Sequence, residues 1–560
     1  MRLQTRHRAS RIVPKMIATA GVLSLLAGAC GGDDDSDAGG TGESTAAPSS
    51  EAPGSDDAPG TVAATTVAGG GDGEPTPGGT ATYLFYAELG VSFDPVKLIV
   101  NTAAILDGTA GYLVYGALVA ADPATREVTP ILAESLTSDD GTVWTLVLRE
   151  GLVFSDGTPL DAEAVKFNWE RHADEENGSA ARGVVATMQS LEVVDSRTLE
   201  ITLSEPNQQF PRTVGQYSIT FIASPAAIEA GTVGEQPIGA GPFVLEEWVR
   251  DDHMTFARND AYWDAPRPYL DEVVVRPILD PTQRINALTT GQGDATMVLS
   301  PADAARLQEQ GFQLNEMSLN GGVSLLFNFE TPLGGDERFR TALRLAIDNE
   351  QISEVVHQGT VTDHATTFMS AESPFYDDSL TFAAPDLERA QELIDELAEE
   401  NGGPVSFALV VGTPTLPMAD AMQAQLSALD NLDVQVEVLQ TGAHAQKVNV
   451  QRDFVVAVGN SFNLDPEPRT HDFLLTGSPR NYTGYSDPEM DAALKAGRVA
   501  ATLEERIDAY RTVQQLLIDQ NAIVLVSRAN HHVMVDDDRL HGVTFEEDGV
   551  IRWDQAWVSE

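Results

Sequence analysis

The segment of residues 31–79 has a composition that cannot build a hydrophobic core. It holds ten Asp or Glu residues, no Lys or Arg, and no aromatic side chain. Such a segment cannot bury enough apolar surface to offset its chain entropy. As a flexible coil it would span on the order of 35 to 42 Å root-mean-square, and its acidic residues would extend it further. We therefore expect a tether here, with the folded body beginning at residue 80.

The residues before this tether are typical of an exported bacterial protein. Residues 1–15 carry basic residues and no acid, and an apolar run from Met16 to Ala29 follows. That run is shorter than the roughly 20 residues of a spanning helix and ends in small residues, as a signal peptide does. The residues "LAGAC" resemble the lipobox of bacterial lipoproteins, although Ala27 stands where Leu is preferred. An ordinary signal peptide with an incidental cysteine is the alternative.

Cys30 is the only cysteine of the chain, so it cannot form an internal disulfide or a zinc cluster based on several thiolates. The lipobox resemblance implies that a signal peptidase cuts before Cys30 and that its thiol carries a diacylglycerol. We therefore expect residues 1–29 to be removed and the protein to be anchored through Cys30. Its location would be the outer face of the bacterial cytoplasmic membrane.

The charge of the chain excludes several classes of partner. There are 34 Lys and Arg against 85 Asp and Glu, a formal net charge of −51. Nucleic acid and anionic lipid surfaces would repel such a chain, so we expect no nucleic-acid partner. Hydrophobic residues make up 42% of the sequence, which is enough for large cores in roughly three or four units of about 150 residues.

From residue 80 onward, strand and helix patterns alternate. Trp144, Leu146 and Leu148 alternate as on a half-buried strand, and Asp161 can cap a helix that places Val165 and Trp169 on one face. The segment 337–359 reads as a single amphipathic helix ending at a glycine C-cap, and residues 432–440 read as a strand. No second apolar run is long enough to span a membrane. The body is predicted to be α/β.

Motifs that would support catalysis or metal binding are missing from the sequence. There is no G-x-S-x-G nucleophile elbow, no H-E-x-x-H zinc helix, no P-loop and no complete dinucleotide fingerprint. His531 and His532 are adjacent and would point to opposite faces of a strand. The aspartates of residues 33–37 lack the glycine and distal glutamate of a calcium loop. We expect a non-enzyme with no metal and no cofactor, although catalytic residues can be close in space without being close in sequence.

Residues 80–560 resemble, in collinear order, family 5 of the solute-binding proteins of bacterial ABC importers, the dipeptide, oligopeptide and nickel-binding group. The residues that carry the resemblance are "SFDPVK" (92–97), "VYGALVAADPATREVTPILAESLTSDDGTVWTLVLREGLVFSDGTPLDAEAVKF" (114–167), "PIGAGPFVLEEW" (237–248), "RNDAYWDAPRPYLDEVVVRPI" (258–278), "INALTTGQGDAT" (285–296), "LLFNFETPLGGDERFRTALRLAID" (325–348), "LDPEP" (464–468) and "NYTGYSDPEMDAAL" (481–494). The resemblance implies a two-lobed α/β fold of the type II periplasmic-binding-protein class, with an extra small α+β domain on the first lobe.

The resemblance also implies how the chain is divided. Lobe one would comprise residues 80–111, 205–307 and 528–560. The extra domain would comprise residues 112–204, and lobe two residues 308–527. Solute would bind one lobe, the lobes would close over it, and the closed form would dock on the permease.

Eight residues are candidate ligand contacts: Tyr86, Gly241, Asn328, Asn460, Ser461, Phe462, Asn463 and Asp465. Gly241 is either a turn or a cleft wall. Asn328 lies at the end of an apolar strand, where α/β clefts place ligand contacts. In peptide-binding relatives an acid a few residues before the Asp-Pro pairs with the peptide amine. That position is Phe462, or Asn463 with one gap, so the carboxylate is missing. Asp465 either substitutes for it or caps the following segment.

The function that this resemblance implies is that of a lipid-anchored receptor. It would capture a small or medium-sized solute, preferably a peptide or peptide-like compound, and deliver it to an ABC permease and its ATPase. We expect it to be a monomer. Two alternatives remain open: a sensor or chaperone on the same fold that does not transport, and a secreted hydrolase.

Overall fold

The computed structural model describes residues 74–559, except residues 88–89, 91, 99–104, 123–124, 362 and 547–548. The fold below is that of the compact unit to which the described residues belong. The expected signal peptide, Cys30 and almost all of the tether lie outside the described residues. No helix in the described ranges is long and apolar enough to cross a membrane.

The described part of the chain contains strands and helices in alternation. The strands are β1 (Thr80–Phe85), β2 (Val119–Ala121), β3 (Val128–Pro130), β4 (Ala133–Thr137), β5 (Val143–Leu148), β6 (Met188–Val193), β7 (Thr198–Leu203), β8 (Phe243–Val249), β9 (His253–Arg258), β10 (Glu272–Pro277), β11 (Ala295–Val298), β12 (Gln313–Phe327), β13 (Val405–Gly412), β14 (Leu432–Leu439), β15 (Val456–Asn463), β16 (Ile523–Val535), β17 (Leu540–His541) and β18 (Trp557–Val558). The helices are α1 (Ile105–Tyr115), α2 (Ala162–Ala173), α3 (Arg182–Val185), α4 (Phe210–Gln216), α5 (Pro225–Glu229), α6 (Pro281–Thr289), α7 (Pro301–Glu309), α8 (Glu337–Ala346), α9 (Asn349–His357), α10 (Leu387–Asn401), α11 (Leu416–Leu426), α12 (Thr441–Ala445), α13 (Arg469–Leu474), α14 (Pro488–Val499) and α15 (Leu503–Asp519).

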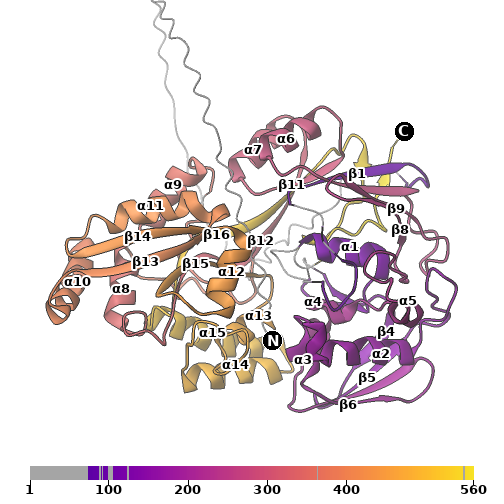
Figure 1. The fold of residues 1–560 in the computed structure, drawn as a ribbon, viewed down its shortest axis with the longest axis horizontal. Helices are drawn as coiled ribbons and strands as arrows, with labels where there is room; N and C mark the ends of the chain where they lie inside the picture. Colours follow the sequence, from indigo (N-terminus) through magenta and orange to yellow (C-terminus); the bar gives the residue numbers. More distant parts are fainter. Residues whose placement is uncertain are drawn as a thin grey trace, which may run out of the picture. The chain divides into compact units, whose positions relative to one another are not determined.

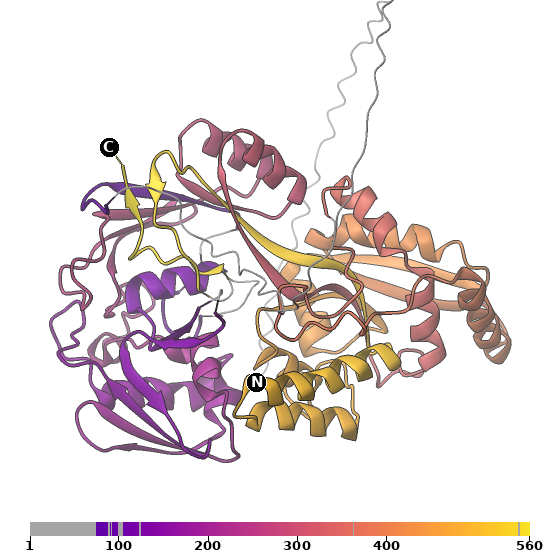
Figure 2. The same cartoon turned by 180° about the vertical axis from the view of Figure 1, so that it is seen from behind.

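One mixed sheet runs through the unit, in the order β14-β13-β15-β12-β16-β11-β1-β10-β9-β8 (Figure 1). The long strands β12 and β16 pair antiparallel in its middle. On one side β12 pairs with β15, and on the other side β16 pairs with β11. Figure 2 shows β16 in yellow as a long strand between the two groups. These two strands therefore connect a β13–β15 group with a β1–β11 group.

Each group of strands has its own hydrophobic core. The first core includes Tyr83, Phe256 and Trp553, which come from β1, β9 and the C-terminal segment. The second includes Phe339 and Leu343 of α8, which pack against the β12–β15 strands together with α10. Two cores joined by two strands are an arrangement in which the halves can move relative to each other without exposing either core.

A separate four-stranded sheet, β4-β5-β7-β6, packs against α2. Trp144, Leu146 and Leu148 of β5 are buried, as their alternation predicts. The carboxylate of Asp161 caps α2 by accepting from Ala164 N at 3.0 Å, as predicted, and Val165 and Trp169 share the buried face. Strand period and helix capping were sufficient to predict β5 and α2 of this unit.

The prediction of one helix over residues 337–359 is wrong. The segment forms two helices, α8 and α9, separated by Ile347 in an extended conformation. The break follows from Asp348, whose side chain accepts a hydrogen bond from Gln351 N and so begins a new helix. Ile347 is still buried in the second core, which explains why the helical spacing looked continuous.

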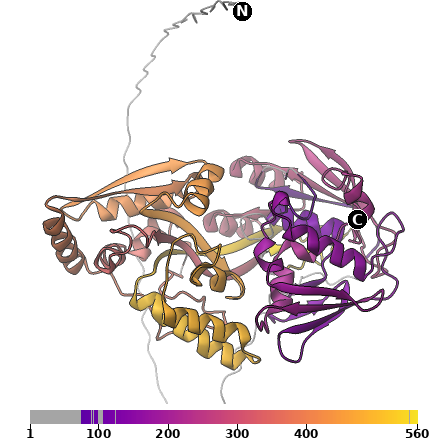
Figure 3. The ribbon, with the colours of Figure 1, turned by 60° about the horizontal axis from the view of Figure 1, so that its bottom comes forward.

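The last helices of the unit, α14 and α15, lie side by side (Figure 3). Thr502 begins α15 with a capping box: its hydroxyl accepts from Glu505 N, and the Glu505 carboxylate accepts from Thr502 N. The buried face of α15 includes Arg506 and Tyr510. This helix thus places a cation and a phenol next to the end of β15.

Candidate functional site

The end of β15 leads into a buried carboxylate, Asp465, which is 1% exposed. Arg506 of α15 donates to its Oδ1, and Arg212 Nε of α4 lies 3.5 Å from its Oδ2. Asp465 also caps the turn that follows, because Oδ1 accepts from Glu467 N at 2.9 Å. Burial alone would raise the pKa of Asp465, but Arg212 and Arg506 outweigh it and hold that pKa below its usual range. Asp465 is ionised, and its charge is already compensated.

Asp465 belongs to a network that extends to neighbouring helices. Glu467 accepts from Arg498 Nη2 at 2.8 Å and from the Tyr510 hydroxyl at 3.0 Å. Arg498 also binds Asp472 at 3.0 Å. We call the following residues the crossing network: Arg212, Tyr217, Asp465, Glu467, Asp472, Arg480, Arg498, Arg506 and Tyr510.

Two members of the crossing network, Arg212 and Tyr217, come from the region of α4 and the small β2–β3 sheet. The Tyr217 hydroxyl donates to Asp472 Oδ2 at 3.0 Å and accepts from Arg480 Nη1 at 2.7 Å. Arg212 and Tyr217 belong to α4 and the residue after it, which pack with β2 and β3. Asp472 and Arg480 follow β15. The network therefore bonds the β2–α4 region to the β15–α15 region through side chains that lie far apart in the sequence.

Two candidate contacts, Asn328 and Gly241, use their polar groups inside the fold. Asn328 donates to Arg452 O at 2.9 Å and to Phe454 O at 3.0 Å, and it accepts from Glu330 N at 3.0 Å. Gly241 N donates to Val114 O at 2.8 Å. A Cβ on Gly241 would lie 2.5 Å from Leu113 O, so glycine permits the close approach of α1. For both residues the contacts present are those of the fold itself.

The remaining candidates are Tyr86, which follows β1, and residues 460–463, at the end of β15. Tyr86 is half-buried beside Phe85, with ring centroids 4.8 Å apart. Asn460 is exposed on β15, whereas Asn463 is buried and donates to Thr470 Oγ1 at 2.9 Å. Ser461 and Phe462 pair with Gly322 and Gly321 of β12, and their side chains lie outside the described part. A role for any of these residues in ligand binding stays a prediction.

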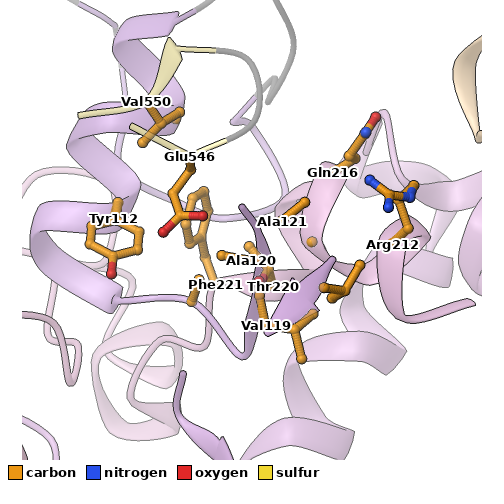
Figure 4. Close-up of a pocket in the computed structure, with 14 residues that line it drawn as sticks. Tyr112, Val119, Ala120, Ala121, Arg212, Gln216, Thr220, Phe221, Glu546 and Val550 are labelled. Carbon is orange, nitrogen blue, oxygen red and sulfur yellow. The ribbon is translucent and has the colours of Figure 1, made fainter. Parts of the chain in front are cut away.

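A cavity that sequence reasoning missed lies among α1, β2, β3, α4 and the C-terminal segment (Figure 4). The space open to the centre of a water molecule inside it is about 40 Å³. Its polar lining consists of Tyr112, Arg212, Gln216, Thr220 and Glu546, and its apolar lining includes Ala121, Val128, Phe221 and Val550. None of the eight candidate contacts lines it. The lining residues come from three separate stretches of the sequence, within positions 108–128, 212–221 and 546–550. No local sequence motif could therefore predict this cavity.

The described ranges were also examined for groups of side chains that could bind a metal ion. Within residues 74–559, gaps excepted, no three His, Cys, Asp or Glu side chains are grouped as a metal site. His531 and His532 both lie on β16, and the described His532 ring has Nε2 at 3.4 Å from a Glu316 carboxylate oxygen. The cavity lining includes the polar residues Tyr112, Gln216 and Thr220 and the charged residues Arg212 and Glu546.

Comparison with known proteins identifies the family. Residues 127–481 match the middle region of the bacterial extracellular solute-binding proteins of family 5. This is more than half of the chain. The chain belongs to this family. The expected family membership is confirmed.

Relatives of this solute-binding family share sequence and fold with the chain. The glutathione-binding protein GsiB of Escherichia coli K12 is 29% identical over 323 residues, which are 57% of this chain and 62% of GsiB. The oligopeptide-binding protein AppA of Bacillus subtilis was solved with a nonapeptide. It has a TM-score of 0.74 at 20% identity, and the match covers 87% of this chain and 100% of the AppA chain. The protein DppA of Helicobacter pylori, solved with the peptide STSA, has a TM-score of 0.74 at 22% identity, covering 87% of this chain and 99% of DppA. These likenesses confirm the type II periplasmic-binding-protein fold.

Proposed function

We propose that this protein is the substrate-binding lipoprotein of an ABC importer. It captures an extracellular solute, a peptide or peptide-like compound, and delivers it to a membrane permease and its ATPase. The observation that carries the proposal is the family match over residues 127–481. Support for the solute class comes from the relatives, which include a glutathione-binding protein and proteins solved with peptides. The protein acts by binding, as a monomer, rather than by catalysis.

Closure of two lobes is the mechanism that we propose for capture. The lobes are residues 80–111 with 205–307 and 528–560, and residues 308–527, with residues 112–204 as the extra domain. Strand β12 begins shortly after residue 307, and the boundary between residues 527 and 528 lies within β16. The crossing network adds bonds that exist only while the lobes are together, so it contributes to the closed state. A solute that binds the closed form more tightly than the open form shifts the population toward it.

Attachment to the membrane is proposed to depend on Cys30. One acyl chain binds a bilayer only marginally, whereas two or more hold stably. A diacylated Cys30 followed by the acidic tether would keep the folded body near a permease and away from the anionic surface. Replacement Cys30→Ser should move the protein from the membrane fraction into the soluble fraction and abolish labelling by radioactive palmitate. Labelled, membrane-bound C30S protein would contradict the anchor.

The function is tested with a panel of peptides, glutathione, sugars and metal ions. A matched solute should raise the melting temperature, because a ligand of the folded state stabilises it by mass action. The same solute should lower the radius of gyration in solution scattering. A panel in which no compound shifts melting, together with the same radius in every sample, would overturn the proposal.

A further inference from the structure

Arg126, in the turn between β2 and β3, has a backbone conformation that is unusual for its residue type. Its φ angle is 59°, in the left-handed region that glycine favours. Its N–H donates to Asp122 O at 2.7 Å, and Asp122 N donates to Glu127 O at 2.9 Å. The Arg126 side chain takes no part in these bonds of the turn. An arginine at such a position costs conformational energy, which its side-chain contacts must offset.

The Arg126 guanidinium reaches two backbone carbonyls that are remote in the sequence. Its Nη1 donates to Leu464 O, and its Nη2 donates to Glu372 O at 3.2 Å. Leu464 follows β15, and Glu372 lies between α9 and α10. In the division of the chain proposed above, Arg126 belongs to the extra domain, residues 112–204, and both acceptors belong to lobe two, residues 308–527. The guanidinium therefore bonds the extra domain to lobe two.

Asn320 on β12 holds the two segments that carry these carbonyls. Its Nδ2 donates to Leu464 O at 3.0 Å, and its Oδ1 accepts from Ser370 N at 3.1 Å, two residues before Glu372. Asn320 is buried and lies where the register of β12 against β16 is interrupted. We call the carbonyls of Leu464 and Glu372 the carbonyl cradle. Both of its segments are bonded to one side chain of lobe two, so the cradle does not depend on Arg126 for its shape.

Arg212 bonds the same turn from the side of α4. It donates to Arg126 O and pairs with Asp465, the residue that follows Leu464. Arg126 and Arg212 therefore bond neighbouring positions of one segment, the first through a carbonyl and the second through a carboxylate. Arg126 is not a member of the crossing network, but its carbonyl is bonded to one.

The two arginines differ in what their withdrawal would leave behind. Separating Arg212 from Asp465 removes part of the charge that compensates a buried carboxylate, which is costly. Separating Arg126 from the carbonyl cradle leaves neither acceptor unpaired, because Leu464 O keeps the bond from Asn320 and Glu372 is exposed to water. A hydrogen bond from a charged donor is stronger than a neutral one. The Arg126 contact is therefore strong when made and can be broken without orphaning its acceptors.

We propose that Arg126 is a latch of the closed form: its guanidinium enters the carbonyl cradle when the lobes close and sets how long they stay closed. The inference rests on the proposed closure and deepens it, because it assigns the opening step to one side chain. Arg126 is a positioning residue, since both of its acceptors in the cradle belong to the protein. The latch therefore acts on the duration of closure rather than on the choice of solute.

The test uses the full chain with Cys30→Ser, so that dyes attach only to two cysteines introduced at exposed positions, Glu163→Cys on α2 and Glu399→Cys on α10. Single-molecule energy transfer between the dyes, without added solute, gives the time spent in the closed form. Arg126→Gly removes the guanidinium and suits a φ of 59°, so it should keep the melting temperature and shorten the closed time by about ten-fold. Arg126→Lys can donate to one carbonyl of the cradle and should shorten the closed time by only about three-fold.

Arg149→Ala is the matched control for the latch. Arg149 also donates to two backbone carbonyls, Ile131 O at 2.5 Å and Pro130 O at 3.4 Å, and both belong to its own domain. This variant should leave the closed time unchanged. Equal closed times in R126G and the parent protein, or equal shortening by R126G and R149A, would overturn the latch.

The same measurements separate the latch from the proposed function. If the latch is overturned while a solute of the panel still stabilises and compacts the parent protein, the importer function stands. If the parent protein shows a single dye separation with and without every solute of the panel, the latch and the closure mechanism fail together. If no solute of the panel shifts melting either, the function itself fails.

Discussion

Asp465 shows at the residue scale how burial and pairing set the energetics of this chain. With two arginines around one buried carboxylate, its removal takes away the negative charge that compensates both buried cations. We predict that Asp465→Asn lowers the free energy of unfolding by about 3 to 5 kcal/mol. Urea denaturation at pH 7 measures this. The exposed Glu392→Gln, which breaks the Arg389 pair on α10, should cost less than about 1 kcal/mol. Equal costs for the two variants would contradict a buried, stabilising pair.

His172 is the residue whose protonation should link stability to pH. It is fully buried on α2, and its Nδ1 is hydrogen-bonded to the Ser179 hydroxyl at 2.6 Å. Burial lowers its pKa from 6.5 to about 4, so the folded state favours the neutral ring. The resulting stability is fully present above pH 6.5 and is lost as the pH falls toward 4. The loss amounts to at most about 3 kcal/mol.

The variant His172→Gln accepts the same hydrogen bond and does not titrate. Its free energy of unfolding, measured by urea denaturation from pH 7 to pH 4, should therefore fall less steeply than that of the parent protein. His253→Gln is the control, because neighbouring Asp252 and Glu247 raise the pKa of that half-buried histidine. It should not reduce the steepness. Parallel curves for H172Q and the parent would rule out His172 as the cause.

At the scale of elements, the contact between α1 and the segment before β8 depends on Gly241. Since a Cβ would lie 2.5 Å from Leu113 O and 2.6 Å from Val114 C, both backbone atoms, Gly241→Ala must displace α1. We predict a loss of about 2 to 4 kcal/mol in the free energy of unfolding. Gly183→Ala in α3, where a Cβ meets nothing within 4 Å, should be neutral or stabilising by about 0.5 to 1 kcal/mol. If urea denaturation gave G241A the same free energy of unfolding as the parent protein, α1 would be able to shift away from the new Cβ at little cost, which would contradict the prediction.

At the scale of the whole molecule, the proposed closure of the lobes predicts that solute affinity depends on the crossing network. Tyr217→Phe removes the hydroxyl that joins Asp472 and Arg480. We expect the solute-free protein to expand in scattering and the affinity for a matched solute to fall by about five-fold, from about 1 kcal/mol of lost closed-state stability. Calorimetry provides the affinity.

Tyr115→Phe is the matched control for this change. Its hydroxyl donates to Phe93 O at 2.6 Å within the first core, so it does not join the two regions. This variant should lose a similar amount of stability and keep both the affinity and the radius of the parent protein. If both tyrosine variants lose affinity equally, the network does not act through closure.

The sequence by itself determined the α/β alternation, the strand around Leu146, the capped helix after Asp161 and the family. These depend on local periodicity, on capping chemistry and on collinear motifs, all of which can be read along the chain. The break at Asp348 was missed because the apolar spacing continues through it, and the side-chain competition that begins α9 leaves that spacing unchanged.

Only the tertiary structure decided what the buried charges do. The carboxylate of Asp465 could be read from sequence as a cap or as an amine partner. The structure shows the capping hydrogen bond and places arginines of two distant helices against the same carboxylate, while a role in ligand binding stays a prediction. Likewise, Tyr112, Gln216 and Glu546 have no local signature, since they meet only when α1, α4 and the C-terminal segment pack together. Pairing and cavity formation depend on long-range packing, whereas strands, caps and family motifs depend on neighbours along the chain.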